Sequence, residues 1–308
     1  MLNAKTIDRV AIIGFGEAGG IFAKDLAAAG MHVRIFDIIF NSKPQRQPML
    51  RKAHACGVVA AHSLKDCLNN AELVISAVTA SSALDVAKEA GSILGESQLL
   101  LDINSVSPET KCKAARYFAR KGARFIEAAV MSAVPKQRLQ VPMLLGGPHA
   151  FETAERLQRI GMNAVPVSDE LGVASAVKMC RSVIMKGLEA LAIESLFAAR
   201  IYGAEDRVLE SLAASFPGMG WEDHLPDYLV SRVAEHGHRR AEEMREVAQT
   251  LRHVGIEPMM ALATAKRQEQ LVSVMARRTL AFGSGERFSW RSLSDAVARP
   301  RRRFRSGK

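Results

Sequence analysis

The stretch VAIIGFGEAGGIFAKDLAAAG, residues 10–30, decides the fold of this chain. It runs from an apolar strand through a G-x-G-x-x-G turn into a helix. In such a turn the first glycine permits a tight bend, the second admits a ligand to the backbone, and the third lets helix and strand pack closely. Unpaired N–H groups at the start of the helix attract an anion. We therefore predict a Rossmann domain that holds a dinucleotide diphosphate; an ordinary glycine-rich turn is the alternative. The residues of this turn are Gly14, Phe15, Gly16, Glu17, Ala18 and Gly19.

Outward from the turn, the first half of the chain alternates short apolar runs with amphipathic stretches. This pattern is typical of an α/β fold with a doubly wound parallel sheet covered by helices. The expected strands are residues 10–13, 33–36, 57–60, 73–77, 99–103, 124–129, 143–145 and 164–167.

The second half reads as helical throughout. Residues 171–202 form one long stretch rich in alanine and leucine and without proline, which predicts an interdomain helix. Helical periodicity continues from 206 to about 280, with breaks at 217–220 and 255–258. We expect a Rossmann domain over 1–169, an all-α domain over 170–298, and a disordered basic tail over 299–308.

Composition excludes several classes of protein. Hydrophobic residues make up 48% of the 308 residues and charged residues 24%, which is ordinary for a globular protein. No run of about 18 apolar residues and no leader pattern is present, so we expect a cytoplasmic protein without membrane contact. Six of the ten net positive charges lie in the tail, which leaves +4 on the body and does not favour nucleic-acid binding. The four cysteines have no C-x-x-C spacing, so we expect buried free thiols and no metal site.

Asp37 lies at the end of the second expected strand, 18 residues after Gly19. A carboxylate at this position can accept hydrogen bonds from the ribose hydroxyls of the adenosine and favours NAD over NADP. Lys43 and Arg46 follow closely and can fold back to receive a 2′-phosphate, which keeps NADP open. The plain alternative is that Asp37 merely begins a loop.

Four segments resemble the β-hydroxyacid dehydrogenase family, which includes 3-hydroxyisobutyrate and 6-phosphogluconate dehydrogenases. They are GFGEAGG with Asp37, DINSVSP at 102–108, FIEAAVMSAVP at 125–135 and GVASAVKMCRSVIMKG at 172–187. The resemblance implies that Val78, Thr79 and Asn104 complete the cofactor site. It maps the catalytic lysine of the family onto Lys178.

Lys178 also has a physical argument in its favour. Lys178, Ser182 and Lys186 recur every four residues on an otherwise apolar stretch, so they form a polar stripe on one helix face. Apolar neighbours and a second ammonium would lower the pKa of Lys178, which would let it exchange a proton with a substrate hydroxyl. A stripe that simply faces water is the alternative.

Two departures from the family pattern bear on the substrate. Ser182 stands where the family usually has asparagine, and Lys186 or Arg181 can take over part of the role of that asparagine. Met131, Ser132, Ala133 and Val134 stand where better-known members have a Ser-Gly-Gly turn. We expect Ser132, Ala133, Ser182 and Lys186 to face the substrate in a pocket of a different shape.

The segment HGHRRAEEMREV at 236–247 resembles a less-characterised branch of the family with a divergent helical domain. The match makes Arg239 the candidate for a contact to a substrate carboxylate, through its planar guanidinium. A solvated charged helix is the alternative. His236 and His238 lie two apart and do not share a helix face, so they do not indicate a metal site.

Together these features predict an NAD(P)-dependent oxidoreductase that acts on the CH–OH group of a small 2- or 3-hydroxy acid, or on the matching aldehyde or keto acid. The expected partners are a small anionic substrate and a second copy of the chain, paired through the helical domain by analogy. An imine-reducing enzyme of the same fold and a non-catalytic dinucleotide sensor are the alternatives.

Overall fold

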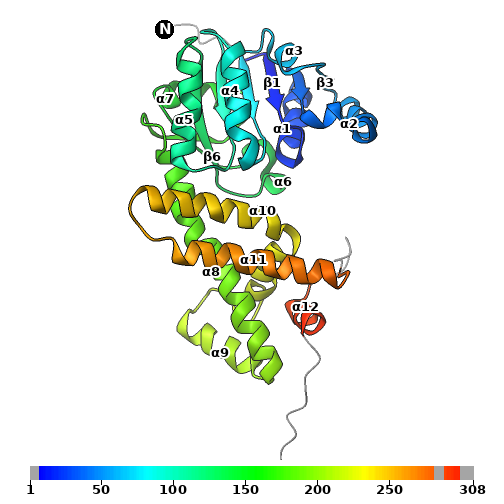
Figure 1. Ribbon diagram of the computed structural model, residues 1–308, viewed down its shortest axis with the longest axis vertical. Helices are drawn as coiled ribbons and strands as arrows, with labels where there is room; N and C mark the ends of the chain where they lie inside the picture. Colours follow the sequence, from blue (N-terminus) through cyan, green and yellow to red (C-terminus); the bar gives the residue numbers. More distant parts are fainter. Residues whose placement is uncertain (1–6, 281–287, 299–308) are drawn as a thin grey trace, which may run out of the picture. The chain divides into compact units, whose positions relative to one another are not determined.

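A computed structural model describes residues 7–280 and 288–298 (Figure 1). The chain divides into two compact units, Met1–Cys180 and Arg181–Lys308. The predicted basic tail at 299–308 lies outside the described residues.

The first unit contains one eight-stranded sheet in the order β3-β2-β1-β4-β5-β6-β7-β8. Every predicted strand is present, so the predicted α/β fold class is confirmed. The strands are β1 (Arg9–Ile13), β2 (His32–Phe36), β3 (Val59–Ala60), β4 (Leu73–Ser76), β5 (Leu99–Asp102), β6 (Arg124–Val130), β7 (Met143–Gly146) and β8 (Ala164–Ser168).

The sheet is mixed and not wholly parallel, which corrects the sequence prediction. Strand β7 pairs antiparallel with β6, with Val130 opposite Met143, while all the other strand pairs are parallel. The connection between them holds only the short α6 (Val134–Gln137) and η3 (Arg138–Gln140). The chain therefore turns back at the same end of the strands, whereas a parallel neighbour needs a longer crossover connection to the opposite end.

Helices cover both faces of this sheet because successive strand residues point to opposite sides. Val10 and Ile12 of β1 pack in one core and Ala11 and Ile13 in the other. The first core includes buried residues of α1 (Glu17–Ala28) and α7 (Ala150–Arg159), and the second those of α3 (Leu64–Leu68), α4 (Ala83–Ile93) and α5 (Pro108–Ala119). The remaining segments are η1 (Ile38–Asn41), α2 (Lys43–Ala55) and η2 (Ala80–Ser82).

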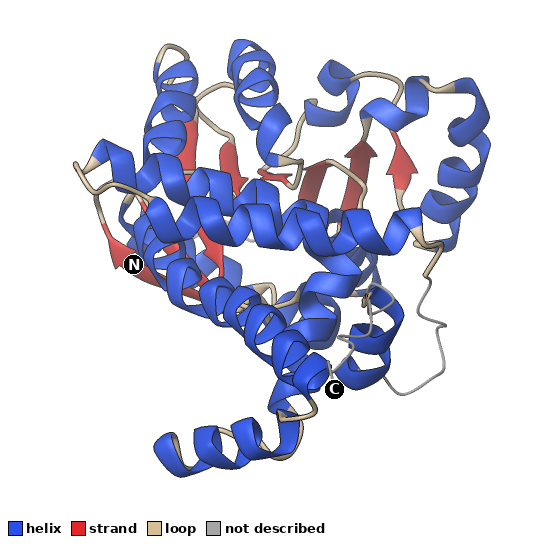
Figure 2. Cartoon of the chain, turned by 60° about the horizontal axis from the view of Figure 1, so that its bottom comes forward, coloured by secondary structure: helices blue, strands red, loops and turns tan. Residues whose placement is uncertain are grey.

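The second unit is helical in its described residues, as predicted (Figure 2). The long helix α8 (Val173–Tyr202) begins in the first unit and continues into the second. It is followed by α9 (Glu205–Ser215), α10 (Leu225–His253), α11 (Met259–Arg277) and α12 (Trp290–Val297). Helices α10 and α11 approach closely at Gly237, where a Cβ atom would lie 2.5 Å from Val272 Cγ1.

Helix α12 was not predicted, because the sequence pattern was followed only to about residue 280. Trp290 and Leu293 of this helix are buried in the core of the second unit. A helix this short has little stability of its own, so its existence depends on burying these two side chains.

The prediction of buried thiols is right for one cysteine and wrong for another. All four cysteines are free; Cys67 is buried, Cys56 and Cys112 are half-buried, and Cys180 is exposed. Burial raises the pKa of the Cys67 thiol to about 12. Cysteine spacing alone does not reveal which of these side chains is exposed.

Candidate cofactor and active site

The glycine turn has the geometry that its three glycines predict. Gly14 has φ +93°, and a Cβ there would lie 2.4 Å from the Ala77 carbonyl oxygen. A Cβ on Gly19 would lie 2.0 Å from the carbonyl oxygen of Gly14. Apart from its chain neighbours, no described residue has an atom within 4 Å of the corresponding position on Gly16. The first and third glycines are therefore fixed by packing, while Gly16 leaves the backbone open to a ligand.

Asp37 is bonded to the glycine turn itself. Its Oδ2 accepts a hydrogen bond from Phe15 N at 2.6 Å, and its Oδ1 accepts one from Ile39 N at 2.9 Å. The second bond caps η1. A carboxylate offers about four acceptor sites, so these two bonds leave capacity for ribose hydroxyls. The reading of Asp37 as a mere loop residue overlooks this bond to the turn, and its contact with a ribose stays a prediction.

A cavity of about 420 Å³ lies beyond the ends of β2 and β3. Phe40, Leu50 and Ala61 give it an apolar wall, and Arg46 lies at its rim with His62. Apolar walls are usual for a site that takes an aromatic ring, and Arg46 is a cation in the lining. That this cavity receives the adenine or a 2′-phosphate stays a prediction. The side chain of Lys43, the other predicted cation, lies outside the described residues.

Lys52 of α2 also contacts the turn, although no sequence motif predicts it. Its ammonium donates to the carbonyl oxygens of Phe15 at 3.1 Å and Gly16 at 3.4 Å. It also lies 4.5 Å from the centre of the Phe15 ring, a cation–π distance. The available signal was the composition of α2, KPQRQPMLRKAHA, which is basic and contains no acid.

Asn104, predicted to bind cofactor, is buried and ties two strand ends together. Its Oδ1 accepts from Val78 N at 2.7 Å, and its Nδ2 donates to Ser76 Oγ at 2.9 Å. Its own N–H donates to Asp102 Oδ1. Asp102 in turn pairs with buried Lys111 at 3.1 Å. Asn104 thus fixes the loop that carries the predicted Val78 and Thr79; direct contact of these three residues with cofactor remains a prediction.

Glu127 of β6 holds the first turn of α8. Its Oε1 accepts from Gly172 N at 2.7 Å and Ala174 N at 3.0 Å, and its Oε2 accepts from Ser175 Oγ at 2.6 Å. The carboxylate is fully buried, and a Cβ on Gly146 would lie 2.4 Å from it. A negative charge also suits the positive end of a helix. Glu127 was not singled out, because an acidic residue inside an apolar strand gives no hint of its partner 45 residues later.

Lys178 lies on α8 one turn after Ser175 and is half-buried. Ser182 is buried four residues further on. The spacing of four residues places both on one helix face, as predicted. Their roles toward substrate stay predictions.

Lys186 is the third residue of the polar stripe predicted on α8. This side chain is buried, and its Nζ donates to Glu243 Oε2 at 2.5 Å. Lys186 is eight residues from Lys178, about 12 Å along the helix. The ammonium of Lys186 thus has its own counter-ion, and its predicted influence on Lys178 stays a prediction.

A second buried pair lies beside the first. Arg240 donates to Glu189 through Nε at 2.7 Å and through a second nitrogen. Burial lowers the pKa of Lys186, against the attraction of Glu243, and burial raises the pKa of Glu189, against the attraction of Arg240. Arg239, the predicted contact to a substrate carboxylate, is exposed, while its neighbour Arg240 makes the pair with Glu189.

Ser132 and Ala133, the predicted substrate residues after β6, are exposed. Ser132 Oγ donates to Gln137 Oε1 at 2.7 Å, so the loop is closed by its own side chains. Among the described residues, no cluster of three or more His, Cys, Asp or Glu side chains is arranged to hold a metal ion. Nor does any described helix combine the length and apolar character that crossing a membrane requires.

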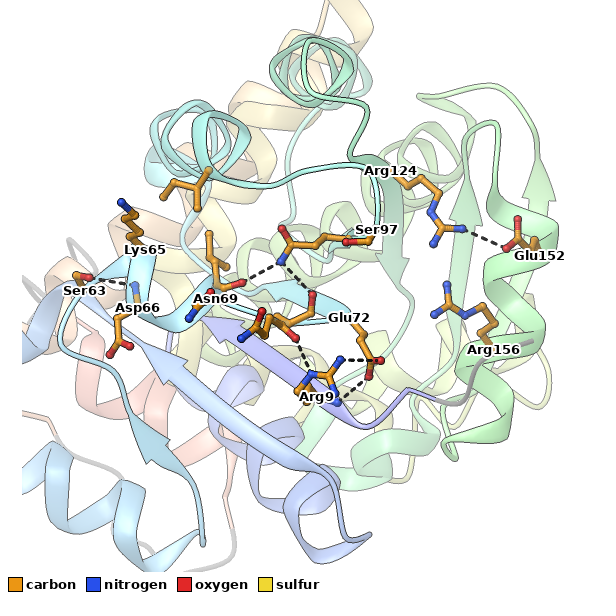
Figure 3. A pocket seen from close by; sticks show the side chains of 15 residues that line it. Arg9, Ser63, Lys65, Asp66, Asn69, Glu72, Ser97, Arg124, Glu152 and Arg156 are labelled. Atoms are coloured by element: carbon orange, nitrogen blue, oxygen red, sulfur yellow. Dashed lines mark hydrogen bonds and ion pairs between the residues drawn. The ribbon is translucent and has the colours of Figure 1, made fainter. Parts of the chain in front are cut away.

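Another cavity, of about 1250 Å³, lies at the opposite edge of the sheet (Figure 3). It surrounds the starts of β1 and β6, whereas the glycine turn follows the end of β1. Arg9 pairs there with Glu72 at 3.0 Å and Arg124 with Glu152 at 3.2 Å. These ion pairs neutralise much of the charge in the cavity. Its lining contains no residue of the glycine turn, so it forms no part of the cofactor site.

Two family models match the chain. Residues 9–167, a little over half of it, match the NAD binding domain of 6-phosphogluconate dehydrogenase. Residues 199–271 match a domain of unknown function (DUF1932). The helical unit thus matches a family model of its own, separate from the model that matches the Rossmann domain.

Similar proteins cover most of the chain. A 3-hydroxyisobutyrate dehydrogenase of Pseudomonas aeruginosa is 27% identical over 77% of this chain and 80% of its own length. The structure of a conserved hypothetical protein from Sinorhizobium meliloti 1021 is 34% identical, covers 95% of this chain and 96% of that one, and has a TM-score of 0.74. A conserved protein of unknown function with structural similarity to 3-hydroxyacid dehydrogenases is 31% identical, covers 85% and 97%, and has a TM-score of 0.67.

Proposed function

The chain belongs to the β-hydroxyacid dehydrogenase family, and from this premise we propose that it is an NAD(P)-dependent dehydrogenase of a small 2- or 3-hydroxy acid. The observation that carries the proposal is the glycine turn, closed by packing at Gly14 and Gly19 and open at Gly16. Its main-chain N–H groups suit a diphosphate. NAD or NADP fits this domain.

When bound, the nicotinamide supplies or accepts the hydride. Lys178 is the proposed general acid and base: its neutral amine takes the proton of the substrate hydroxyl during oxidation, and its ammonium returns that proton during reduction. Glu127 supports this role indirectly, because its three bonds fix the helix turn that precedes Lys178. Ser182 and the loop at Ser132 are proposed to orient the substrate.

Arg239 and Lys186 have weaker support as substrate residues. The ammonium of Lys186 already donates a hydrogen bond to Glu243. We retain Arg239 as the proposed contact to a substrate carboxylate, because its side chain is exposed.

A homodimer formed through the helical domain is also proposed, and sedimentation of the purified chain tests it.

Steady-state assays of hydroxy acids with NAD and NADP test the function. Replacing Lys178 by alanine should lower kcat by about 10²- to 10⁴-fold, the usual contribution of a positioned acid or base, while NAD(P)H affinity stays the same. Lys88→Ala, which removes an exposed lysine from α4, is the matched control and should behave as the parent. Full activity of Lys178→Ala would refute the mechanism, and absence of affinity for both dinucleotides would refute the function.

A further inference from the structure

We propose that Lys52 is a positioning residue for the cofactor diphosphate: it holds the peptide planes of the glycine turn so that their N–H groups face the ligand. The inference rests on the proposed function only in requiring that the chain bind NAD or NADP. Lys52 lies outside the G-x-G-x-x-G pattern. It belongs to α2, which follows α1, β2 and η1 along the chain.

The contacts of Lys52 fall on the carbonyl side of the turn. Its ammonium is bonded to the oxygens of Phe15 and Gly16, at 3.1 and 3.4 Å. In a trans peptide the C=O and the following N–H point in opposite directions. Fixing these two carbonyls therefore directs the N–H groups of Gly16 and Glu17 to the other side, where the helix N-terminus receives an anion.

Asp37 completes this arrangement from the other end of the same peptide segment. Its carboxylate accepts the N–H of Phe15 at 2.6 Å. The carboxylate of Asp37 thus accepts the N–H of Phe15, and the ammonium of Lys52 donates to the carbonyl oxygen of the same residue. Gly16 adopts many conformations when unrestrained, and this pair of bonds limits the freedom that a ligand would otherwise have to remove.

Gly20 provides the space for Lys52. The dinucleotide pattern requires glycine at 14, 16 and 19, but it does not require one at 20. A Cβ on Gly20 would lie 3.1 Å from Lys52 Nζ and 3.4 Å from its Cε. A side chain at residue 20 would therefore press against the end of Lys52, whereas glycine leaves the ammonium room beside the turn.

Charge adds to the effect of geometry. Helix α2 carries Lys43, Arg46, Arg51 and Lys52 and no acid, so nothing within this helix cancels its positive charge. An ammonium bonded to two peptide oxygens also polarises those amides and strengthens their N–H groups as donors. Both effects favour a ligand with two phosphate charges.

Titration of NADH and NADPH fluorescence with purified protein tests the proposal. Lys52→Met keeps most of the side-chain stem and removes the ammonium; we expect about tenfold weaker binding, the scale of a lost charge-assisted bond. Arg51→Met removes the same charge one residue earlier from an exposed side chain, and it should change the affinity by less than about twofold. The difference between these variants separates position from net charge.

Gly20→Ala provides an independent test, because it keeps the charge and obstructs its seat. It should weaken binding in the same direction, and the double variant with Lys52→Met should bind no more weakly than Lys52→Met alone. Lys52→Arg should recover most of the affinity. The melting temperature without ligand should change by about 3 °C or less in each case, which a general loss of structure would not allow.

The outcomes are distinct. Parental affinity in Lys52→Met, or equal losses in Lys52→Met and Arg51→Met, would overturn the positioning role and leave the proposed function intact. A parent protein that binds neither NADH nor NADPH would overturn both proposals.

Discussion

Charged side chains at the proposed site differ in their partners from those buried in the second unit, although the first unit also holds the buried ion pair of Lys111 with Asp102. In the first, Asp37, Lys52 and Glu127 bond to main-chain groups and fix the course of the backbone where the proposed site lies. In the second, Lys186 bonds to Glu243, a side chain of opposite charge on another helix. Bonds to the backbone position a site, whereas buried pairs align helices and respond to pH.

The largest expected effect is on the first arrangement, at Glu127. Glu127→Ala leaves the N–H groups of Gly172 and Ala174 without their acceptor and the Ser175 hydroxyl with only the Gly172 carbonyl oxygen, at 3.2 Å. It should lower the free energy of unfolding by about 3–5 kcal/mol. Urea denaturation measures it. Glu155→Ala, which removes an exposed acid 3.9 Å from Arg159, is the control and should cost less than about 0.5 kcal/mol. Similar small losses in both variants would show that the cap of α8 contributes little.

The pair of Glu189 with Arg240 should give the next largest effect. Glu189→Ala leaves a mostly buried guanidinium unpaired and should destabilise by about 3 kcal/mol, whereas replacing both residues with Leu and Met should cost less than that single change. Chemical denaturation of the single and double variants distinguishes these cases. A double variant that costs as much as Glu189→Ala, or more, would mean that the pair stabilises the unit better than two apolar side chains do.

A pH dependence should separate the units further. Burial raises the folded-state pKa of Glu189 above its ordinary 4.5, so the folded state binds more protons in the interval above that value. Its contribution to stability is full below pH 4.5 and is lost as pH rises through the raised pKa. The free energy of unfolding of the parent minus that of Glu189→Gln, measured from pH 4 to 7, should fall with rising pH. A flat difference would contradict this reading.

The smallest effect concerns two thiols and leaves stability unchanged. With a pKa of about 12 instead of 9.0, Cys67 holds about a thousandfold less thiolate than an ordinary cysteine near pH 8, and its burial excludes reagents as well. Cys180 is exposed and should react first with a thiol reagent. Cys180→Ser should remove the fast phase in native protein. Reaction of Cys67 at a comparable rate before unfolding would show that the first unit opens readily.

Much of the fold could be read from the sequence, because strands, turns and helices follow local rules. The glycines of the turn and the long helix were placed correctly from spacing and composition alone. The antiparallel β7 was missed because strand direction depends on where the chain returns to the sheet. Helix α12 was missed because its stability comes from packing.

Part of the candidate site was equally legible. Gly14, Gly16 and Gly19 are marked by a pattern between the first strand and its helix, and Asp37 by its place at the end of the second strand. Lys52 and Glu127 are not, because their partners are backbone atoms, 37 and 45 residues away respectively, which carry no residue-specific signal.

The sequence by itself determined that this chain has a Rossmann domain with a dinucleotide turn, a long helix and a helical second unit. Each of these depends on short-range periodicity and on glycine, both of which act within a few residues. Only the tertiary structure decided which charges are buried and what each one binds, because burial and partnership are set by chain segments that meet after folding.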